Sequence, residues 1–371
     1  MEALGLGARL LGVACVVATV LPLLRARAWW VRVWDFPRLQ VAVLALAALA
    51  GMLWAGVGGW GWAGWALAAV TGAAAAGQVA VVLPYTPVWP VQSVRGGGDG
   101  SGPAALRLVV VNVLMTNRVV DGLFDAVRAA DPDVVLALET DAWWVARLRE
   151  GLAASHPHAV ERAQDNTYGL VLRSRLPLVE PEVRFLVHPG IPSARVGIRL
   201  RTGVVVRFYA VHPEPPSPTE AESSLGRDAE LVTVGREIAM RTGPTVVAGD
   251  LNDVAWSRTS RLFRRISRLL DPRVGRGLFP TFHAGRWWWP VRWPLDHVFH
   301  SEDFALCEVR RLPAFGSDHF PILIALEHAP GAGADTVPEA DAGDEAEALE
   351  TVEEAREAVA AGELTPARDE R

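Results

Sequence analysis

The sequence predicts an α/β domain of two packed β-sheets with helices outside, preceded by a transmembrane helical region. Three observations support this prediction. Long uncharged apolar runs are confined to residues 1–90. Short apolar strands then alternate with helical segments over residues 106–328, which is the pattern of a mixed α/β domain. Polar side chains follow many of these strands, where they would gather at one edge of a sheet.

The first 90 residues contain three runs that approach the roughly 20 apolar residues needed to cross a bilayer. They cover about residues 3–24, 39–57 and 62–83, and tryptophans crowd their expected ends, as in interfacial aromatic belts. A cleaved signal peptide would explain only the first run. A buried helical core would need amphipathic faces, which the runs lack. The sequence therefore predicts an integral membrane protein with about three spans.

The loop between the first two runs favours one orientation. It carries Arg25, Arg27, Arg32 and Arg38 against a single acid, Asp35. Positively charged loops stay in the cytoplasm, so three spans would leave the C-terminal domain on the cytoplasmic side as well. A missing or half-inserted first span would reverse this orientation, so the sequence gives only a slight preference for the cytoplasm.

Each later segment has its own signal. Prolines end the third run because they cannot continue a helix, and the Gly-rich stretch 91–105 is expected to be a flexible linker. Within 106–328, apolar runs predict strands and longer periodic segments predict helices. The expected strands cover 106–111, 134–138, 169–172, 196–200, 204–211, 245–248, 295–299, 305–309 and 321–325, and the expected helices cover 119–130, 141–153 and 219–240.

The C-terminal segment differs from the rest in charge. Residues 331–371 hold 13 acidic residues against three Arg, a net charge of −10, so the other 330 residues carry +4 of the total of −6. Because it also has few large apolar residues, the tail 329–371 is expected to be acidic and disordered, with a transient helix over 346–361. Five arginines between Arg258 and Arg268 have helical spacing and predict a solvated helix face in preference to a phosphate track.

Polar residues at the strand ends predict the chemistry. A single Asp there is usually a turn or cap residue, but a set that combines carboxylates, amides and imidazoles favours a shared site. Its members are Asn112, Glu139, His212, Asp250, Asn252, Asp296, Asp318 and His319. Asp296, Asp318 and His319 can form a carboxylate–imidazole–metal cluster, and Asp250 and Asn252 can grip a phosphate. The set predicts a metal-dependent phosphoesterase.

The ordered motifs around these residues resemble the endonuclease/exonuclease/phosphatase superfamily, over about 60% of the chain. Residues 110–113 resemble its strand ending in Asn, 131–139 its Pro-Asp-strand-Glu motif, 168–177 its Gly-strand-Ser-Arg-x-Pro segment, 209–212 its strand ending in His, and 249–252, 295–298 and 316–321 its last three motifs. The resemblance implies a four-layer α/β/β/α sandwich of two mixed β-sheets. With the apolar runs, it suggests a membrane-anchored bacterial branch located in the plasma membrane.

The sequence departs from the family pattern at several positions, and these departures limit which family activities it can be expected to share. Leu138 stands where the family usually has Gln before its Glu, and Leu114 stands where abasic-site endonucleases carry an acid. No carboxylate near Tyr168 in the sequence supplies the partner that nuclease relatives give to the residue equivalent to His212. The activities of abasic-site endonucleases and pancreatic nucleases therefore do not transfer directly to this chain.

Residue chemistry suggests a role for each site residue. Glu139 is the best ligand for Mg²⁺, with Mn²⁺ as an alternative, because hard ions prefer carboxylates; Asn112 and Asp318 would complete its coordination. Asp296 would orient His319, which either activates water or binds the phosphate, and Asp250 is the rival base. Asn252 and His212 would donate hydrogen bonds to the phosphate oxygens.

The expected activity is hydrolysis of a phosphodiester or phosphomonoester bond beside the membrane. The expected partners are the lipid bilayer and a phosphate-ester substrate, which is a lipid, a small molecule or a nucleic acid, with no obligate protein partner. An endonuclease acting on DNA or RNA is the first alternative, although the domain lacks a strongly basic stripe. A catalytically inactive membrane adaptor that binds through its acidic tail is the second. The Trp-rich stretch before Asp296 is either a local aromatic cluster or a substrate-side wall touching the membrane.

Overall fold

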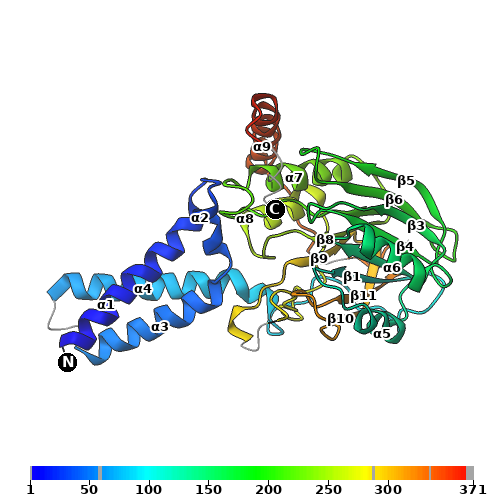
Figure 1. The fold of residues 1–371 in the computed structure, drawn as a ribbon. Coiled ribbons are helices and arrows are strands. Elements are labelled where there is room, and N and C mark those ends of the chain that lie inside the picture. The colour runs from blue at the N-terminus through cyan, green and yellow to red at the C-terminus, as the bar shows by residue number, and fades with distance from the viewer. Residues whose placement is uncertain (1, 57–60, 286–288, 334–335, 365–371) are drawn as a thin grey trace.

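A computed structural model describes residues 2–56, 61–285, 289–333 and 336–364. A helical region projects from one side of a larger α/β body (Figure 1). The helical region contains α1 (Glu2–Val20), α3 (Arg38–Trp54) and α4 (Gly61–Val82), joined by the short elements η1 (Leu21–Leu23), α2 (Trp29–Arg32) and η2 (Val33–Asp35). Small residues allow these helices to approach closely, since a Cβ at Gly12 of α1 would lie 2.5 Å from Met52 of α3.

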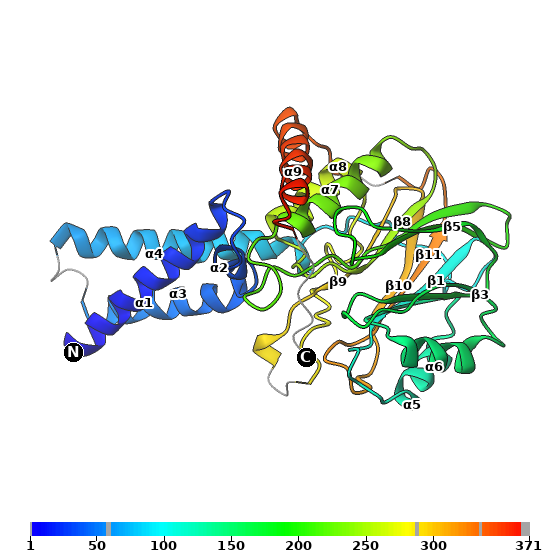
Figure 2. The ribbon, with the colours of Figure 1, turned by 45° about the horizontal axis from the view of Figure 1, so that its top comes forward.

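Two of these helical segments are long and apolar enough to cross a membrane. They are Glu2–Leu23 and Gly61–Tyr85, the second of which includes η4 (Leu83–Tyr85). The expected middle span qualifies only as a bent pair, in which Trp29–Asp35 and Arg38–Trp54 meet at 76°. The described helices thus supply two candidate spans, or three when the bent pair counts as one. The C-terminal end of α1, the N-terminal end of α3 and the C-terminal end of α4 all face the body (Figure 2).

The body contains two mixed β-sheets. The first has the order β10-β11-β1-β2-β4-β3 and the second the order β5-β6-β7-β8-β9. The strands are β1 (Ala105–Asn112), β2 (Val134–Leu138), β3 (His158–Arg162), β4 (Leu170–Ser174), β5 (Leu178–Arg184), β6 (Ser193–Arg199), β7 (Val205–Ala210), β8 (Thr245–Asp250), β9 (Asp296–His300), β10 (Phe304–Arg311) and β11 (Ile322–His328). The pairs β1–β2 and β7–β8 are parallel, and the other pairs are antiparallel.

Alternating side chains create the layers. Leu108 and Val110 of β1 point into the core between the two sheets, where they meet Phe208 of the second sheet. Val111 points outward, against α5 (Asp121–Ala130) and α6 (Ala142–Leu152). On the other side, α7 (Leu225–Ala239) and α8 (Arg258–Ser267) cover the outer face of the second sheet. The predicted four-layer α/β/β/α architecture is confirmed, and its strand ends present the site.

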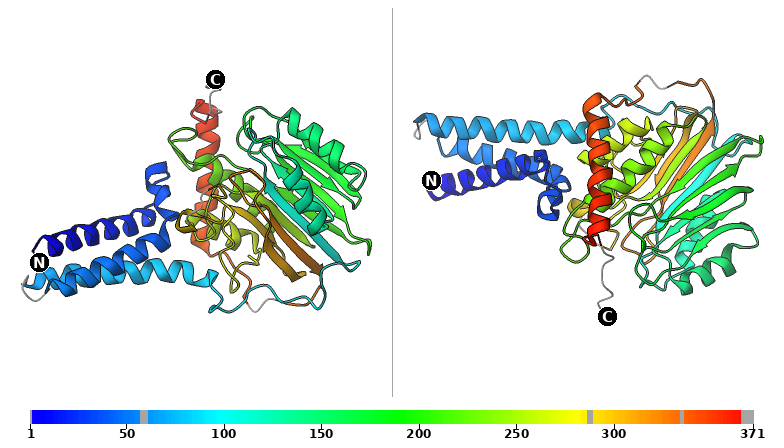
Figure 3. Two further views of the ribbon diagram at one scale, coloured as in Figure 1. Left: turned by 60° about the horizontal axis from the view of Figure 1, so that its bottom comes forward. Right: turned by 90° about the horizontal axis from the view of Figure 1, so that it is seen from above.

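The acidic tail differs from the expectation of disorder. Residues 342–361 form the helix α9 (Ala342–Ala361), which begins with a capping box between Asp341 and Asp344 and lies across α7 and α8 (Figure 3). Its Ala348 is buried against an apolar cluster from those helices. Ion pairs replace the large apolar contacts that the sequence lacks: Arg265 binds Asp344 at 2.7 Å, and Arg258 binds Glu347. Arg258 and Arg265 were expected to lie on a solvated helix face. They instead pair with acidic residues of α9, so they form neither a solvated face nor a phosphate track.

The first half of the segment 91–105, which was expected to be a flexible linker, is held to the body by backbone hydrogen bonds. Leu306 of β10 accepts a hydrogen bond from the Gly96 amide at 2.8 Å, and its own amide donates to Val94 at 2.7 Å. The helical region itself packs into the body, because the Tyr85 hydroxyl donates to Ala255 at 2.7 Å and the Trp256 indole donates to Asp35 at 2.7 Å. The body and the helical region also share an apolar cluster, in which Val82 and Tyr85 pack with Trp256.

Candidate active site

The polar residues predicted at strand ends gather at one edge of the two sheets. Asn112 ends β1 and Glu139 follows β2, while Asp250 ends β8 and Asp296 begins β9 beside it. His319 lies in the loop before β11. This convergence follows from topology, because parallel neighbours end at the same edge and an antiparallel neighbour begins there. Asp250 and Asp296 are direct partners in the β8–β9 ladder.

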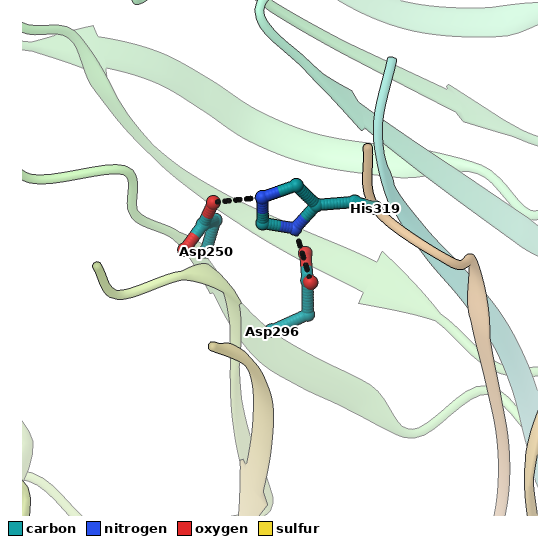
Figure 4. Close-up of side chains that lie close together, drawn as sticks. All are labelled: Asp250, Asp296 and His319. Atoms are coloured by element: carbon teal, nitrogen blue, oxygen red, sulfur yellow. Dashed lines mark hydrogen bonds and ion pairs between the residues drawn. The ribbon is translucent and has the colours of Figure 1, made fainter. Parts of the chain in front are cut away.

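His319 lies between two buried carboxylates (Figure 4). Its Nδ1 lies 2.7 Å from Asp296 Oδ2, and its Nε2 lies 3.5 Å from Asp250 Oδ2. Asp296 is held in turn, since its backbone amide donates to the Thr281 hydroxyl at 3.1 Å. The Phe282 ring packs on the imidazole with 5.0 Å between the ring centres. The imidazole is thus fixed in position, with its Nε2 side toward Asp250.

Asn112 links the two sheets at the site. Its amide nitrogen donates to Glu139 Oε1 at 2.7 Å and to Asp250 Oδ2 at 3.1 Å. Its oxygen accepts from the Leu114 amide at 3.0 Å, and the Met115 amide donates to Glu139 Oε2 at 3.2 Å. In this arrangement Asn112 positions the two carboxylates, and its oxygen is directed away from them.

The other three predicted residues have different surroundings. His212 Nε2 lies 4.0 Å from Asp250 Oδ2. Asn252 uses its side chain to donate to the Pro213 carbonyl at 3.0 Å, and its backbone amide donates to Asp250 Oδ1 at 2.9 Å. Among the described residues, Asp318 Oδ1 is buried without a hydrogen-bond partner. His212 and Asp318 thus have atoms free for a ligand, whereas the Asn252 amide is already engaged.

Close backbone approach explains why glycine precedes Asp250. A Cβ on Gly249 would lie 1.8 Å from the Val211 carbonyl oxygen, so any side chain there would push β8 away from the end of β7. That contact brings the Asp250 and His212 ends of the two strands together.

Sequence reasoning missed one acidic residue. The Tyr168 hydroxyl donates to Glu220 Oε2 at 2.6 Å, and the Tyr168 ring lies 5.3 Å from the His212 ring. Glu220 is 52 residues from Tyr168 in the sequence and lies on the loop between β7 and α7, outside any recognised motif. Glu220 is thus a partner of the Tyr168 hydroxyl, whereas the carboxylate that faces His212 is that of Asp250.

The electrostatics of the cluster differ from residue to residue. Burial alone would lower the pKa of His319, but Asp296 and Asp250 outweigh it and raise that pKa to about 10. Burial lowers the pKa of His212 to about 4, so this ring is neutral near pH 7. Burial would raise the pKa of Asp250, yet His319 and His212 bring it below its usual value. The result is an imidazolium facing an ionised carboxylate.

The residues around Glu139 fit a hard divalent cation. Burial raises the pKa of Glu139 to about 7, which shows that the described protein groups compensate its charge only in part. The unpartnered Asp318 Oδ1 adds a second available carboxylate oxygen. Ligand atoms of Asp250, Asp296 and His319 also lie within 4.8 Å of one another. A protonated His319 has no lone pair for a metal, so the carboxylates are the better donors.

The fold and the edge cluster agree with a match to known proteins. A family model described as the endonuclease/exonuclease/phosphatase family matches residues 109–319, more than half of the chain. The chain belongs to this family. The endonuclease/exonuclease/phosphatase family includes metal-dependent phosphoesterases, nucleases and phosphatases, and the matched segment includes every predicted site residue from Asn112 to His319.

Curated relatives of this family member include two UPF0294 proteins. The one from Yersinia enterocolitica is 31% identical over 188 residues, which cover 47% of this chain and 57% of the relative. The one from Klebsiella pneumoniae is 30% identical over 185 residues, covering 48% and 57%. The chain thus spans little more than half the length of the curated relatives it matches. A solved structure of humanized TDP2 from D. rerio has a TM-score of 0.51 and 16% identity, covering 60% of this chain and 99% of that one, and supports the fold alone.

Proposed function

We propose that the protein is a membrane-anchored, divalent-metal-dependent phosphoesterase that hydrolyses a phosphodiester or phosphomonoester bond. The observation that carries the proposal is the contact of His319 with Asp296 at 2.7 Å and with Asp250 at 3.5 Å. Asn112 ties the same Asp250 to Glu139. We assign His319 the role of cationic hydrogen-bond donor, Asp250 that of general base and Glu139 that of metal-binding carboxylate.

The protein residues divide the reaction between them. His319, held protonated by Asp296, donates a hydrogen bond to a phosphate oxygen and stabilises the negative charge that grows there. Asp250 is ionised and accepts the proton of the attacking water, so it takes the role of general base. Neutral His212 donates a second hydrogen bond to the phosphate, from the Asp250 side of the site. Asn252 supports this set by fixing Asp250 through its backbone amide.

Glu139 and Asp318 would hold the metal ion, with Asn112 orienting Glu139. Bound Mg²⁺ or Mn²⁺ would supply Lewis-acid polarisation of the phosphate and stabilise the leaving oxygen. In the protein, the ion would also compensate the buried charge of Glu139.

We further propose that α1, α3 and α4 anchor the protein in a bacterial plasma membrane, with residues 1–90 as the membrane region and 106–328 as the catalytic domain. The segment 25–38, which contains the four arginines, lies on the same side as the body. The preference of positive loops for the cytoplasm favours a cytoplasmic active site.

The alternatives receive less support. A nuclease would use exposed cations to track a polymer backbone, yet Arg258 and Arg265 are paired with acidic residues of α9. An inactive adaptor would bind through an exposed acidic tail, yet α9 packs on the body.

The test uses the full chain in detergent with a soluble phosphodiester and a soluble phosphomonoester, with Mg²⁺, Mn²⁺ or a chelator. We expect metal-dependent hydrolysis of at least one. His319→Ala should lower turnover at least a hundredfold, while His158→Ala, a half-buried histidine of β3, should leave turnover unchanged. Hydrolysis that persists in a folded His319→Ala protein would contradict the proposal.

A further inference from the structure

Aromatic side chains form a continuous line from the active site to the helical region. The Phe282 ring packs on His319, with 5.0 Å between ring centres, and stacks on Trp293 at 6.4 Å. Trp293 meets Phe36 edge to face at 5.9 Å. All three aromatic residues are half-buried. Phe36, just before α3, is thus linked to His319 by three ring contacts.

The loop that carries Pro290 and Trp293, here called the rim of the site, lies beside the start of α3. The Gln40 side chain, in the first turn of α3, donates a hydrogen bond to the Pro290 carbonyl. Gln40 immediately precedes the uncharged run that begins at Val41. If α3 enters the bilayer with that run, Pro290 lies at the level of the membrane surface. Under that condition the rim of the site would lie beside lipid headgroups.

The segment beside this rim also exposes apolar side chains. Trp30 is 52% exposed, Val33 44% and Leu39 38%, although they lie next to a folded body. Exposed large apolar groups on one short segment are typical of contact with a membrane interface, where Trp in particular partitions. If the helices span the membrane, this exposed segment would lie at the bilayer surface, close to the rim of the site.

Two cations flank the residue after His319. The Arg311 guanidinium lies 4.1 Å from the centre of the Phe320 ring, and that of Arg292 lies 5.1 Å from it. Arg292 precedes Trp293 in the chain, so the cations and the aromatic line share one rim. A ligand with an apolar body and an anionic head would match both features.

We infer that the substrate is an amphiphile of the bilayer, a phospholipid with an anionic headgroup. Its phosphate would reach His319 while its apolar part stays against Phe282, Trp293 and Phe36 at the membrane surface. The inference rests on the proposed phosphoesterase activity, whose substrate it specifies. The soluble polymer DNA or RNA would gain nothing from this aromatic line unless its bases stacked there, so nucleic acid is the competing outcome of the test.

The experiment uses the full chain reconstituted in lipid vesicles with Mg²⁺. Four substrates are compared: vesicle phosphatidylglycerol, vesicle phosphatidylcholine, a soluble phosphodiester, and plasmid DNA. The expected result is hydrolysis of phosphatidylglycerol with a kcat/KM above that for the soluble diester. Trp293→Ala should lower the ratio of lipid to soluble-diester turnover about tenfold, since aromatic anchors carry most of such contact energy.

Two further variants keep the test decisive. Trp293→Phe retains an apolar ring and should recover most of the ratio, and thermal unfolding identifies any variant that fails to fold. Trp143→Ala is the matched control, because Trp143 lies on α6 under Arg118 and outside the site. It should leave the ratio unchanged.

Each failure has a distinct meaning. Cleavage of the soluble diester without cleavage of either phospholipid would overturn the lipid inference and leave the proposed function standing. Preferred cleavage of plasmid DNA would do the same. If Trp293→Ala leaves the ratio of lipid to soluble-diester turnover unchanged, the aromatic line does not take part in substrate recognition and the inference is wrong. If a folded protein hydrolyses none of the four substrates, both the proposed function and the inference are rejected.

Discussion

Tyr168 donates a hydrogen bond of 2.6 Å to Glu220, and this pair braces the wall of the site beside His212. The loop that carries Glu220 is held from the helical region, because the Trp29 amide donates to the Glu222 carbonyl at 2.9 Å and the Ser224 amide donates to the Arg27 carbonyl at 2.8 Å. The end of the first helix and the catalytic edge are thus connected through one loop.

Glu220→Ala should lower kcat about tenfold, because loss of the Tyr168 partner frees the ring beside His212 and small misplacements near reacting groups are costly. Glu220→Gln keeps an acceptor oxygen and should retain most activity. The measurement is kcat and KM on a soluble phosphodiester, with Glu222→Ala, an exposed side chain on the same loop, as the control. Equal activity of Glu220→Ala and Glu222→Ala would show that the pair has no role.

Trp29→Pro should lower kcat severalfold by removing the amide that donates to the Glu222 carbonyl, a hydrogen bond worth about 1 kcal/mol. Trp29 is the first residue of α2, where proline is tolerated, and Ala28 before it has the extended conformation that proline requires (φ −60°, ψ 137°). Trp29→Ala removes the indole but keeps the amide, so it is the matched control. Amide hydrogen exchange of the loop 216–224 should be faster in Trp29→Pro than in Trp29→Ala. Identical exchange in the two variants would show that the Trp29 amide does not hold this loop.

Mg²⁺ should raise the melting temperature of the wild type but not of Glu139→Gln. At tenfold excess over its dissociation constant, a bound ion adds about 1.4 kcal/mol to the free energy of unfolding. Glu150→Gln removes an exposed carboxylate of α6 and should keep the full shift. The readout is thermal unfolding with and without chelator, which needs no substrate. If Mg²⁺ still raises the melting temperature of Glu139→Gln, the ion binds at a site that does not include Glu139.

Acid should destabilise the body in part through His300. Burial lowers the pKa of this histidine to about 4, and its ring is bonded to Ser93 at 2.8 Å. Between pH 6.5 and 4 the unfolded chain binds a proton that the folded chain excludes, so the free energy of unfolding falls as pH falls, by up to about 3 kcal/mol. His300→Gln should flatten this dependence between pH 7 and 5, as measured by unfolding in detergent. A slope identical to that of the wild type would exclude His300 as the cause.

Local signals predicted the elements that form the site. The strands that end at Asn112 and Asp250, and the strand that begins at Asp296, are visible in the sequence as apolar runs. The meeting of these strand ends follows from sheet geometry. The Glu220 contact could not be predicted in this way, because it joins Tyr168 to a loop 52 residues away with no periodic pattern. Likewise, α9 has too few large apolar residues to predict docking, and its order depends on arginines of α8 far away in the sequence.

The pairing of β1 with β11 has a consequence for biosynthesis. These strands neighbour each other in the middle of the first sheet, although one begins at Ala105 and the other ends at His328. The sheet cannot close until β11 has emerged from the ribosome, whereas α1 and α4 emerge well before it. If they insert on emergence, the body completes its folding while already tethered to the bilayer. The contact of Tyr85 with Ala255 would then hold the folding domain close to its membrane anchor.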